Sequence, residues 1–348
     1  METISIADNM SSIVQQFSRK RKEKSEERLS GSAKSSDHIL EEFDESAMEQ
    51  PLLDGRKKAR CEKQDDELGQ VKHALKRCHR PDWSIRSIYF LERCLSEKLS
   101  YLRQLVVTED VILTADKMRC LLVREHGIDK RIPDQIMNCY IGIMKNQPSI
   151  STDVLMLSTF DTRILQKEYL FQSESEAHRF YITEMGNNFL QSDMTFFPIQ
   201  VGDPTFAHHG HWIVGVLNPE TKEFQILNSW AVVAGTRTIQ KLIAGIQVCI
   251  DASLDSKGIR SRGIRPTILN WPIRVIPNLP QQKDSWSSGL FALKYMQFWN
   301  GSKLTRDFTQ DDIDIFRKLL VGELILSNLN KRKDIQDEIK NKLYAFDF

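Results

Sequence analysis

The chain has 348 residues, of which 41% are apolar and 27% charged, so it is long enough for one large core or two modest ones. Its formal net charge of +1 excludes a strong overall attraction to nucleic acid or to a membrane surface. No apolar run reaches the roughly 18 residues of a membrane span, and residues 1–8 do not have the pattern of a signal peptide. We therefore expect a soluble intracellular protein with neither a membrane nor a nucleic acid as its partner.

The cysteines form no CxxC pair and have no metal-ligand spacing, which indicates free thiols in a reducing compartment. They are Cys61, Cys78, Cys94, Cys120, Cys139 and Cys249. A metal site built on His208, His209 and His211 is the alternative use of the one histidine cluster. No cysteine or carboxylate stands beside these histidines at ligand spacing, and a zinc site needs three or four ligands. The sequence therefore predicts no metal and no cofactor.

Residues 1–70 are rich in Ser, Glu and Lys and poor in aromatic residues, a composition that buries too little surface to offset the entropy of ordering. We expect a disordered tail with basic and acidic stretches. Its two basic clusters, Arg19–Lys22 and Arg56–Arg60, indicate nuclear import. The alternative is ordinary solvated charge in a flexible tail, and the protein would then be cytoplasmic.

Helical spacing of leucines predicts a helix over 85–105, and residues 71–110 as a whole are expected to form a helical linker or cap. Further helices are expected over 118–125, behind a cap at Thr114, and over 133–144, where Pro133 opens the helix. The Leu-rich segment 154–170 also favours a helix.

Three apolar runs predict strands over 194–201, 211–218 and 223–229, and a short fourth strand is expected over 273–276. Helices are predicted over 236–254, over 292–299 and, behind a capping box at Thr309, through about 326. Residues 331–348 are expected to be a charged and loosely attached tail, either helix or coil. Helices, then a strand cluster, then helices indicate an α+β fold with a small, mostly antiparallel sheet.

A run of polar residues leads directly into the apolar helix at 292–299. Its last serine, Ser288, stands at the helix start, where free N–H groups and the helix dipole would stabilise an anionic nucleophile. Gln282 lies six residues upstream, and its amide could help to hold an oxyanion. The alternative is that Ser288 is simply the N-cap of the helix, a position that favours serine.

A candidate base opens the strand at 211–218. The strand begins with His211-Trp212, and the turn at 218–222 returns the chain along a second strand that ends at Asn228. Because antiparallel strands joined by a short turn bring their outer ends together, we expect His211 and Asn228 to lie close. A base and the residue that orients it need this geometry.

His-Trp, then an amide before Ser, then Gln-x5-nucleophile-Gly resembles the ubiquitin-like-protein-specific (SUMO or sentrin-type) cysteine proteases, particularly their divergent plant members. The resemblance covers about 117–330, and the protease domain is expected over 111–330. It implies a papain-like or adenain-like cysteine peptidase fold. It also implies cleavage after the C-terminal Gly-Gly of SUMO or a relative, with this ubiquitin-like protein and its conjugates as partners.

Carried over by position, His211 matches the general base of the family, Asn228 its orienting Asp, Gln282 its oxyanion donor and Ser288 its nucleophilic Cys. In the substrate groove, Trp212 and Gly289 match the family pattern, whereas Arg131 stands where the family has a tryptophan that lines the tunnel for the Gly-Gly tail.

Serine in place of cysteine is the most serious departure. A thiol works here because it ionises beside histidine near neutral pH, and a hydroxyl cannot be ionised in that way. We therefore expect a hydrolase fold whose catalysis is impaired. The alternatives are a pseudoprotease that binds a ubiquitin-like protein, and a degenerate copy with neither activity.

Overall fold

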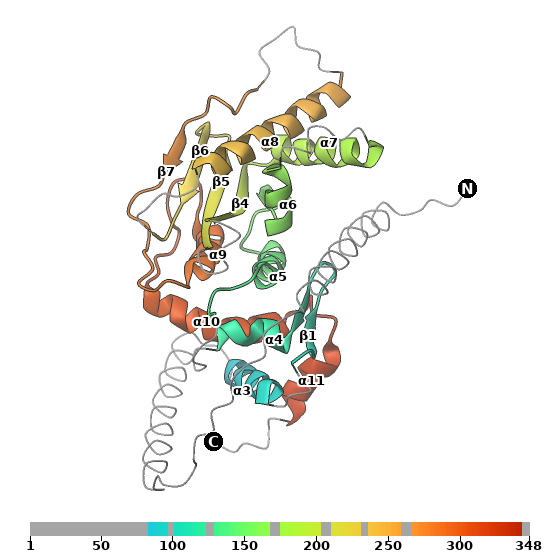
Figure 1. Ribbon diagram of the computed structural model, residues 1–348, viewed down its shortest axis with the longest axis vertical. Helices are drawn as coiled ribbons and strands as arrows, with labels where there is room; N and C mark the ends of the chain where they lie inside the picture. Colours follow the sequence, from blue (N-terminus) through green and yellow to red (C-terminus); the bar gives the residue numbers. More distant parts are fainter. Residues whose placement is uncertain are drawn as a thin grey trace, which may run out of the picture. The chain divides into compact units, whose positions relative to one another are not determined.

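A computed structural model describes residues 83–96, 101–122, 129–167, 175–202, 210–230, 236–258 and 266–342 (Figure 1). The chain divides into two compact units, Met1–Glu62 and Lys63–Phe348, and all described residues belong to the second. The predictions for residues 1–70, Cys61, Cys78, His208 and His209 lie outside the described residues. Among the helices that the structure describes, none is long and apolar enough to cross a bilayer.

A five-stranded sheet forms the centre of this unit, with the strand order β3-β4-β5-β6-β7. Its strands are β3 (Val154–Met156), β4 (Met194–Val201), β5 (His211–Asn218), β6 (Glu223–Leu227) and β7 (Ile273–Val275). The three longest strands, β4, β5 and β6, pair antiparallel, and the short edge strands β3 and β7 pair parallel to their neighbours. The predicted α+β class with a mostly antiparallel sheet is confirmed.

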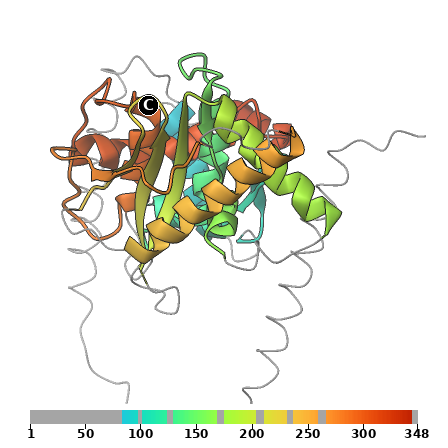
Figure 2. The ribbon, with the colours of Figure 1, turned by 90° about the horizontal axis from the view of Figure 1, so that it is seen from above.

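Each face of the sheet is covered by its own helices, because successive residues of a strand point to opposite faces. Ile213 and Leu217 of β5 lie in one apolar cluster with Leu242 of α8. Trp212 and Val214 lie in the other cluster, with helices α5, α9 and α10. Figure 2 shows α8 lying across the sheet. The helices of the first face are α6 (Thr159–Leu165), α7 (Glu176–Gln191) and α8 (Thr236–Ser256); those of the second are α5 (Asp134–Lys145), α9 (Ser288–Phe298) and α10 (Gln310–Ile325).

Helix α9 is buried on nearly all sides, which fits its apolar sequence. Leu290, Phe291, Ala292 and Leu293 are each at most 1% exposed. The helix packs on β5, α5 and α10. Its first residue, Ser288, is therefore held against the sheet by a complete shell of core contacts.

Segments from both ends of the described chain complete the second cluster. They are α3 (Trp83–Ser96), the hairpin of β1 (Gln104–Val107) and β2 (Ile112–Thr114), α4 (Ala115–Met118), the 3-10 turn η2 (Arg119–Leu121) and α11 (Lys333–Lys342). In α11, Ile335 and Ile339 are fully buried in this cluster. The expectation of a loosely attached segment from 331 onward is therefore wrong for α11.

Two predicted helices are shorter than expected because strand pairing replaces part of them. The helix expected over 85–105 ends at Ser96, Leu102 is 82% exposed, and β1 follows. The segment expected to be helical over 154–170 begins instead with β3, which pairs with β4, before α6 starts at Thr159. Tertiary pairing thus overrides local helical preference in both places. The helix expected over 118–125 is reduced to α4 and η2 within the described residues.

Candidate active site

The His211 imidazole is paired with Asn228 across the β5–β6 hairpin. His211 is the first residue of β5 and Asn228 directly follows β6. The distance between His211 Nε2 and Asn228 Oδ1 is 2.7 Å. The antiparallel register, which sets Val214 opposite Leu227, brings these two strand ends together as the sequence predicted.

A second hydrogen bond fixes the proton on His211. The backbone N–H of Trp230 donates to Asn228 Oδ1 at 3.0 Å, so this Asn228 atom is an acceptor. His211 Nε2 must therefore donate to it, and the neutral ring keeps its basic lone pair on Nδ1. Burial lowers the pKa of His211, and the hydrogen bond to Asn228 acts in the opposite direction. The site thus holds a neutral imidazole whose orientation is set.

Ser288 lies beside the same strand. It is the first residue of α9 and is 2% exposed. Its Oγ accepts a hydrogen bond of 3.2 Å from the backbone N–H of Trp212, the residue next to His211. The alternative that Ser288 is the N-cap is wrong, because Ser287 occupies that position. The structure therefore brings the serine of the motif and the candidate base to the same edge of β5.

Gln282 is held between the two parts of the site. Its Oε1 accepts from Ser229 Oγ at 2.7 Å, and its Nε2 donates to the Asp284 carbonyl oxygen at 2.7 Å. Its backbone N–H donates to the Ser229 carbonyl oxygen at 3.0 Å. Ser229 directly follows Asn228, so the oxyanion candidate is tied to the base strand. The side-chain nitrogen of Gln282 carries two hydrogens, and one of them bonds to the Asp284 carbonyl oxygen. The other could donate a hydrogen bond to an oxyanion.

A buried charged network supports the turn before Ser288. Asp284 Oδ1 accepts the backbone N–H groups of Trp286 and Ser287 at 2.9 and 2.7 Å, and its Oδ2 accepts from Ser287 Oγ at 2.6 Å. Ser287 Oγ accepts in turn from the guanidinium of Arg317 at 3.2 Å, and Gln310 Nε2 donates to Asp284 Oδ2 at 3.0 Å. Of the two serines at the start of α9, Ser287 thus has its hydroxyl committed to these bonds.

Arg317 anchors this network to two distant segments. It is 2% exposed, and its guanidinium donates to the carbonyl oxygens of Cys120 and Lys130 at 2.8 and 2.6 Å. Burial lowers the pKa of Arg317, and the carboxylates of Asp284 and Asp314 oppose this effect. Neither Arg317 nor Asp284 was identified from the sequence. The available signals were a charged residue on the apolar face of α10 and an Asp three residues before the N-cap of a helix.

The predicted groove residues lie around the start of α9. A Cβ atom on Gly289 would come within 2.4 Å of Ile132 Cγ1 and 3.1 Å of Trp212 Cδ1, so both side chains pack directly on this glycine. Trp212 is 3% exposed and belongs to the core. Arg131 precedes Ile132, and its Nε lies 3.1 Å from Asp129 Oδ1.

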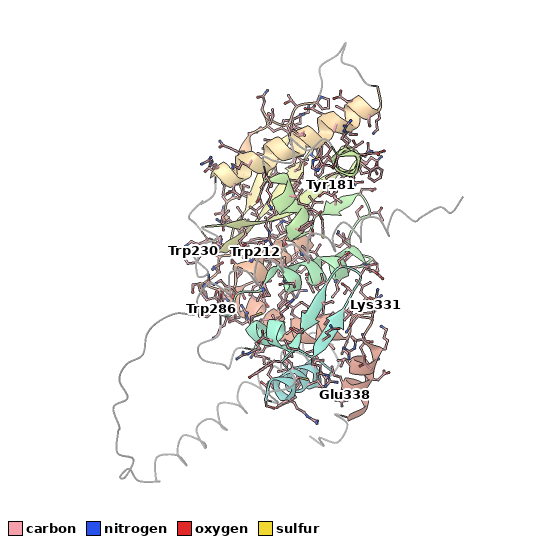
Figure 3. All side chains as sticks on the ribbon, turned by 45° about the vertical axis from the view of Figure 1, so that its right-hand side comes forward. Tyr181, Trp212, Trp230, Trp286, Lys331 and Glu338 are labelled. Carbon is pink, nitrogen blue, oxygen red and sulfur yellow. The ribbon has the colours of Figure 1, made fainter. Side chains whose placement is uncertain are left out.

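Two other tryptophans of the site loops, Trp230 and Trp286, are 45% and 37% exposed. They lie on the same side of the view as Trp212 in Figure 3. The ammonium of Lys130 lies 5.0 Å from the ring centre of Trp286. The loops that carry Asn228 and Ser288 therefore each present an indole to solvent.

The described residues offer no group of three or more His, Cys, Asp or Glu side chains that could hold a metal ion. Cys94, Cys120, Cys139 and Cys249 are buried and form no disulfide among the described residues. Burial raises the pKa of Cys120, Cys139 and Cys249 to about 12, which keeps these thiols protonated and poorly nucleophilic.

Comparison with known proteins gives the family. The model of the Ulp1 protease family, C-terminal catalytic domain, matches residues 130–327. Among curated proteins, the putative ubiquitin-like-specific protease 1B of Arabidopsis thaliana is 26% identical over 142 residues, 41% of this chain and 37% of that protein. The ubiquitin-like-specific protease ESD4 of the same plant is 21% identical over 221 residues, 62% of this chain and 40% of that protein. The chain thus spans less than half the length of these relatives.

Chains of solved structures are also similar to this chain. The C-terminal Ulp1 protease domain in complex with Smt3, the yeast ortholog of SUMO, is 12% identical with a TM-score of 0.49, covering 70% of this chain and 96% of that one. The Xanthomonas campestris effector XopD bound to ubiquitin is 11% identical with a TM-score of 0.35, covering 57% and 94%. Because the family model matches more than half of the 348 residues, this chain belongs to the Ulp1 protease family and carries a catalytic domain of that type.

Proposed function

We propose that the chain is a catalytically silent Ulp1-family domain that binds the C-terminal tail of a ubiquitin-like protein without hydrolysing the bond after it. The observation that carries the proposal is the pairing of a half-buried His211 with the neutral side chain of Asn228, next to a serine at position 288. The hydrogen-bonded framework of a peptidase site is present, but two groups that supply its reactivity are different.

The chemical step is unfavourable for two reasons. Attack by Ser288 requires transfer of its proton to His211, which creates an imidazolium ion. Burial already disfavours that ion, as the lowered pKa of His211 indicates, and Asn228 offers a dipole where a carboxylate would offer a full charge. A thiol would need less help, because a thiolate–imidazolium pair forms without a separate strong base. General base catalysis is typically worth about 10²–10⁴-fold in rate, and we expect most of it to be lost here.

Binding does not depend on the reactive atom. The contacts of Gln282, Gly289 and the Asp284–Arg317 network hold the start of α9 against the wall at 130–132. These contacts are independent of whether residue 288 carries oxygen or sulfur. The family and the two Arabidopsis relatives, both ubiquitin-like-specific proteases by name, support a ubiquitin-like protein as the ligand.

The test compares the full chain with its Ser288→Cys variant. Hydrolysis is measured on SUMO-type proteins and ubiquitin that carry a fluorogenic C-terminal amide, and binding of the same proteins is measured by calorimetry. We expect saturable binding by both chains, no hydrolysis by the unmodified chain, and covalent capture of an electrophilic C-terminal probe by the Ser288→Cys variant. His211→Ala in the Ser288→Cys background is the control and should abolish capture.

Other results have distinct meanings. Hydrolysis by the unmodified chain that His211→Ala abolishes would establish a serine-dependent peptidase and overturn the proposal. If Ser288→Cys binds but does not react, the additional Arg131→Trp change tests whether the cationic side chain obstructs the tail. Absence of binding and of capture by every variant would leave only the degenerate copy.

A further inference from the structure

We propose that Trp230 is a positioning residue whose indole keeps water from the His211–Asn228 pair and thereby holds His211 in its neutral form. Trp230 touches both members of the pair. Its backbone N–H donates to Asn228 Oδ1 at 3.0 Å, and its ring meets the imidazole of His211 at 5.9 Å between centres and 86° between planes.

A turn after β6 brings Trp230 to this place. The paired residues of the β5–β6 hairpin end at Val214 and Leu227, so residues 228–230 lie beyond the ladder. The backbone N–H of Trp230 donates to Asn228 Oδ1 two residues earlier, which turns the chain at this point. The rings of Trp230 and His211 therefore meet at the open end of the hairpin, next to the His211–Asn228 hydrogen bond.

The side chain of Trp230 is partly covered and partly open to solvent. The side chain is 45% exposed, although tryptophan is a large apolar residue that folding normally buries. It therefore contributes little to the core and forms an outer wall over the imidazole. A hydrogen bond that is shielded from water in this way is electrostatically stronger than one in contact with solvent.

Among the described residues, the groups that face His211 are uncharged. They are Asn228 and Trp230 from the segment after β6, and Val201, which lies opposite His211 on β4. Ser288 of α9 reaches the neighbouring backbone N–H. Burial is the larger cause of the lowered pKa of His211 and the Asn228 hydrogen bond the smaller, with no charged side chain of the described residues among the causes. Removal of water, rather than a nearby charge, thus sets the proton affinity of His211.

The ring could act in the opposite direction. An aromatic face attracts a cation within about 6 Å, worth about 0.5–1 kcal/mol at exposed sites, and this would stabilise an imidazolium. At 5.9 Å the two rings are near the limit of that interaction. We take exclusion of water as the larger of the two effects of the ring, because the Trp230 ring stands beside the imidazole at a partly exposed position. Removing the ring must therefore raise the pKa if the inference is right.

The experiment separates the ring from the backbone contact. Trp230→Ala removes the indole but keeps the N–H that donates to Asn228 Oδ1, so the tautomer of His211 is preserved. Trp230→Phe keeps an aromatic wall. Trp286→Ala is the matched control, because Trp286 is a similarly exposed indole in the other site loop and its described ring contact is with Lys130. The full chain is labelled with ¹³C-histidine, the imidazole signals are followed against pH, and His211→Gln identifies the His211 signal.

In Trp230→Ala we expect the pKa of His211 to rise toward the ordinary value near 6.5, whereas Trp230→Phe should restore most of the depression and Trp286→Ala should leave it unchanged. An unchanged or lower pKa in Trp230→Ala would overturn the inference, as would an equal rise in Trp286→Ala. Thermal unfolding checks that each variant is folded. The inference takes His211 as the base of the proposed function, but the titration needs neither ligand nor turnover, so the two can fail separately.

Discussion

The base side and the nucleophile side of this site are built in different ways. His211, Asn228 and Trp230 belong to one hairpin, and the two residues of the central pair are 17 positions apart. Ser288 instead depends on a turn that Arg317 secures from α10, and Arg317 also reaches Cys120, 197 positions away. One side follows from a local strand register, and the other from a buried charge that joins three distant segments.

This difference explains how the geometry of the site can be retained after the nucleophile has been replaced. The contacts that place Ser288 run through Ser287, Asp284 and Arg317, and none of them uses the side chain of residue 288. The guanidinium of Arg317 is buried, and loss of its hydrogen-bond partners would leave a buried charge uncompensated and destabilise the fold. Exchange of the reactive atom therefore leaves the framework under the same physical constraints as before.

The largest loss of stability is expected from a substitution that disrupts the nucleophile side. Arg317→Met removes the donor for Ser287 Oγ and for the carbonyl oxygens of Cys120 and Lys130. Breaking a buried charged network by deleting one partner costs about 3–5 kcal/mol. Urea unfolding of the full chain should show a loss of this size.

Two variants sharpen this result. Arg317→Lys keeps a charge but cannot reproduce the planar fork of donors, so we expect an intermediate loss. Arg274→Met removes the exposed ion pair with Glu223, whose closest atoms are 3.4 Å apart, and should cost at most about 1 kcal/mol. Equal losses for Arg317→Met and Arg274→Met would contradict the anchoring role.

Sequence periodicity was sufficient for elements with a long and regular pattern. Helix α8 and strands β4 and β5 lie where they were expected, because each carries a full period of buried residues. The short strand β3 was missed, since three residues hold no period and only pairing with β4 defines them. The attachment of helix α11 to the core was not predicted, because only two isoleucines of an otherwise charged segment are buried in the core.

For the site, the hairpin and the Gln-x5-Ser-Gly spacing were sufficient to bring His211, Asn228, Gln282 and Ser288 into one region. The Arg317 anchor could not be derived in this way, because the partners of a buried charge are set by tertiary packing. The place of Trp230 could not be derived either, because its contact with His211 depends on the turn after β6 and not on the paired register.

A smaller effect is expected where the two sides meet at Gly289. In Gly289→Ala, the new methyl group would meet Ile132 at 2.4 Å and Trp212 at 3.1 Å. Overpacking of this kind typically costs about 1–3 kcal/mol. Gly142→Ala on α5 is the matched control, because nothing lies within 4 Å of its Cβ position, and it should be neutral or stabilise by about 0.5–1 kcal/mol. Ile132→Ala should reduce the cost of Gly289→Ala in a double-mutant cycle; strict additivity would show that Ile132 is not the obstacle.

The smallest effect concerns the base side. Asn228→Asp keeps an acceptor for the Trp230 N–H and for His211 Nε2, and adds a negative charge beside the imidazole. An opposite charge at this distance favours the imidazolium, so the pKa of His211 should rise by at least about one unit, which is about 1.4 kcal/mol.

In the unmodified chain the pKa of His211 is lowered, so the contribution of His211 to stability is complete above the unfolded value near 6.5 and decreases as the pH falls through the folded pKa. If Asn228→Asp lifts the folded pKa above 6.5, the sign reverses: the added stability is complete below 6.5 and is lost as the pH rises through the new pKa. Unfolding free energies at several pH values between 5 and 8, with His211→Gln as the reference in both backgrounds, measure this reversal. An unchanged pH dependence in Asn228→Asp would show that His211 and residue 228 are not coupled, and the base side would then lack the pairing on which the proposed function rests.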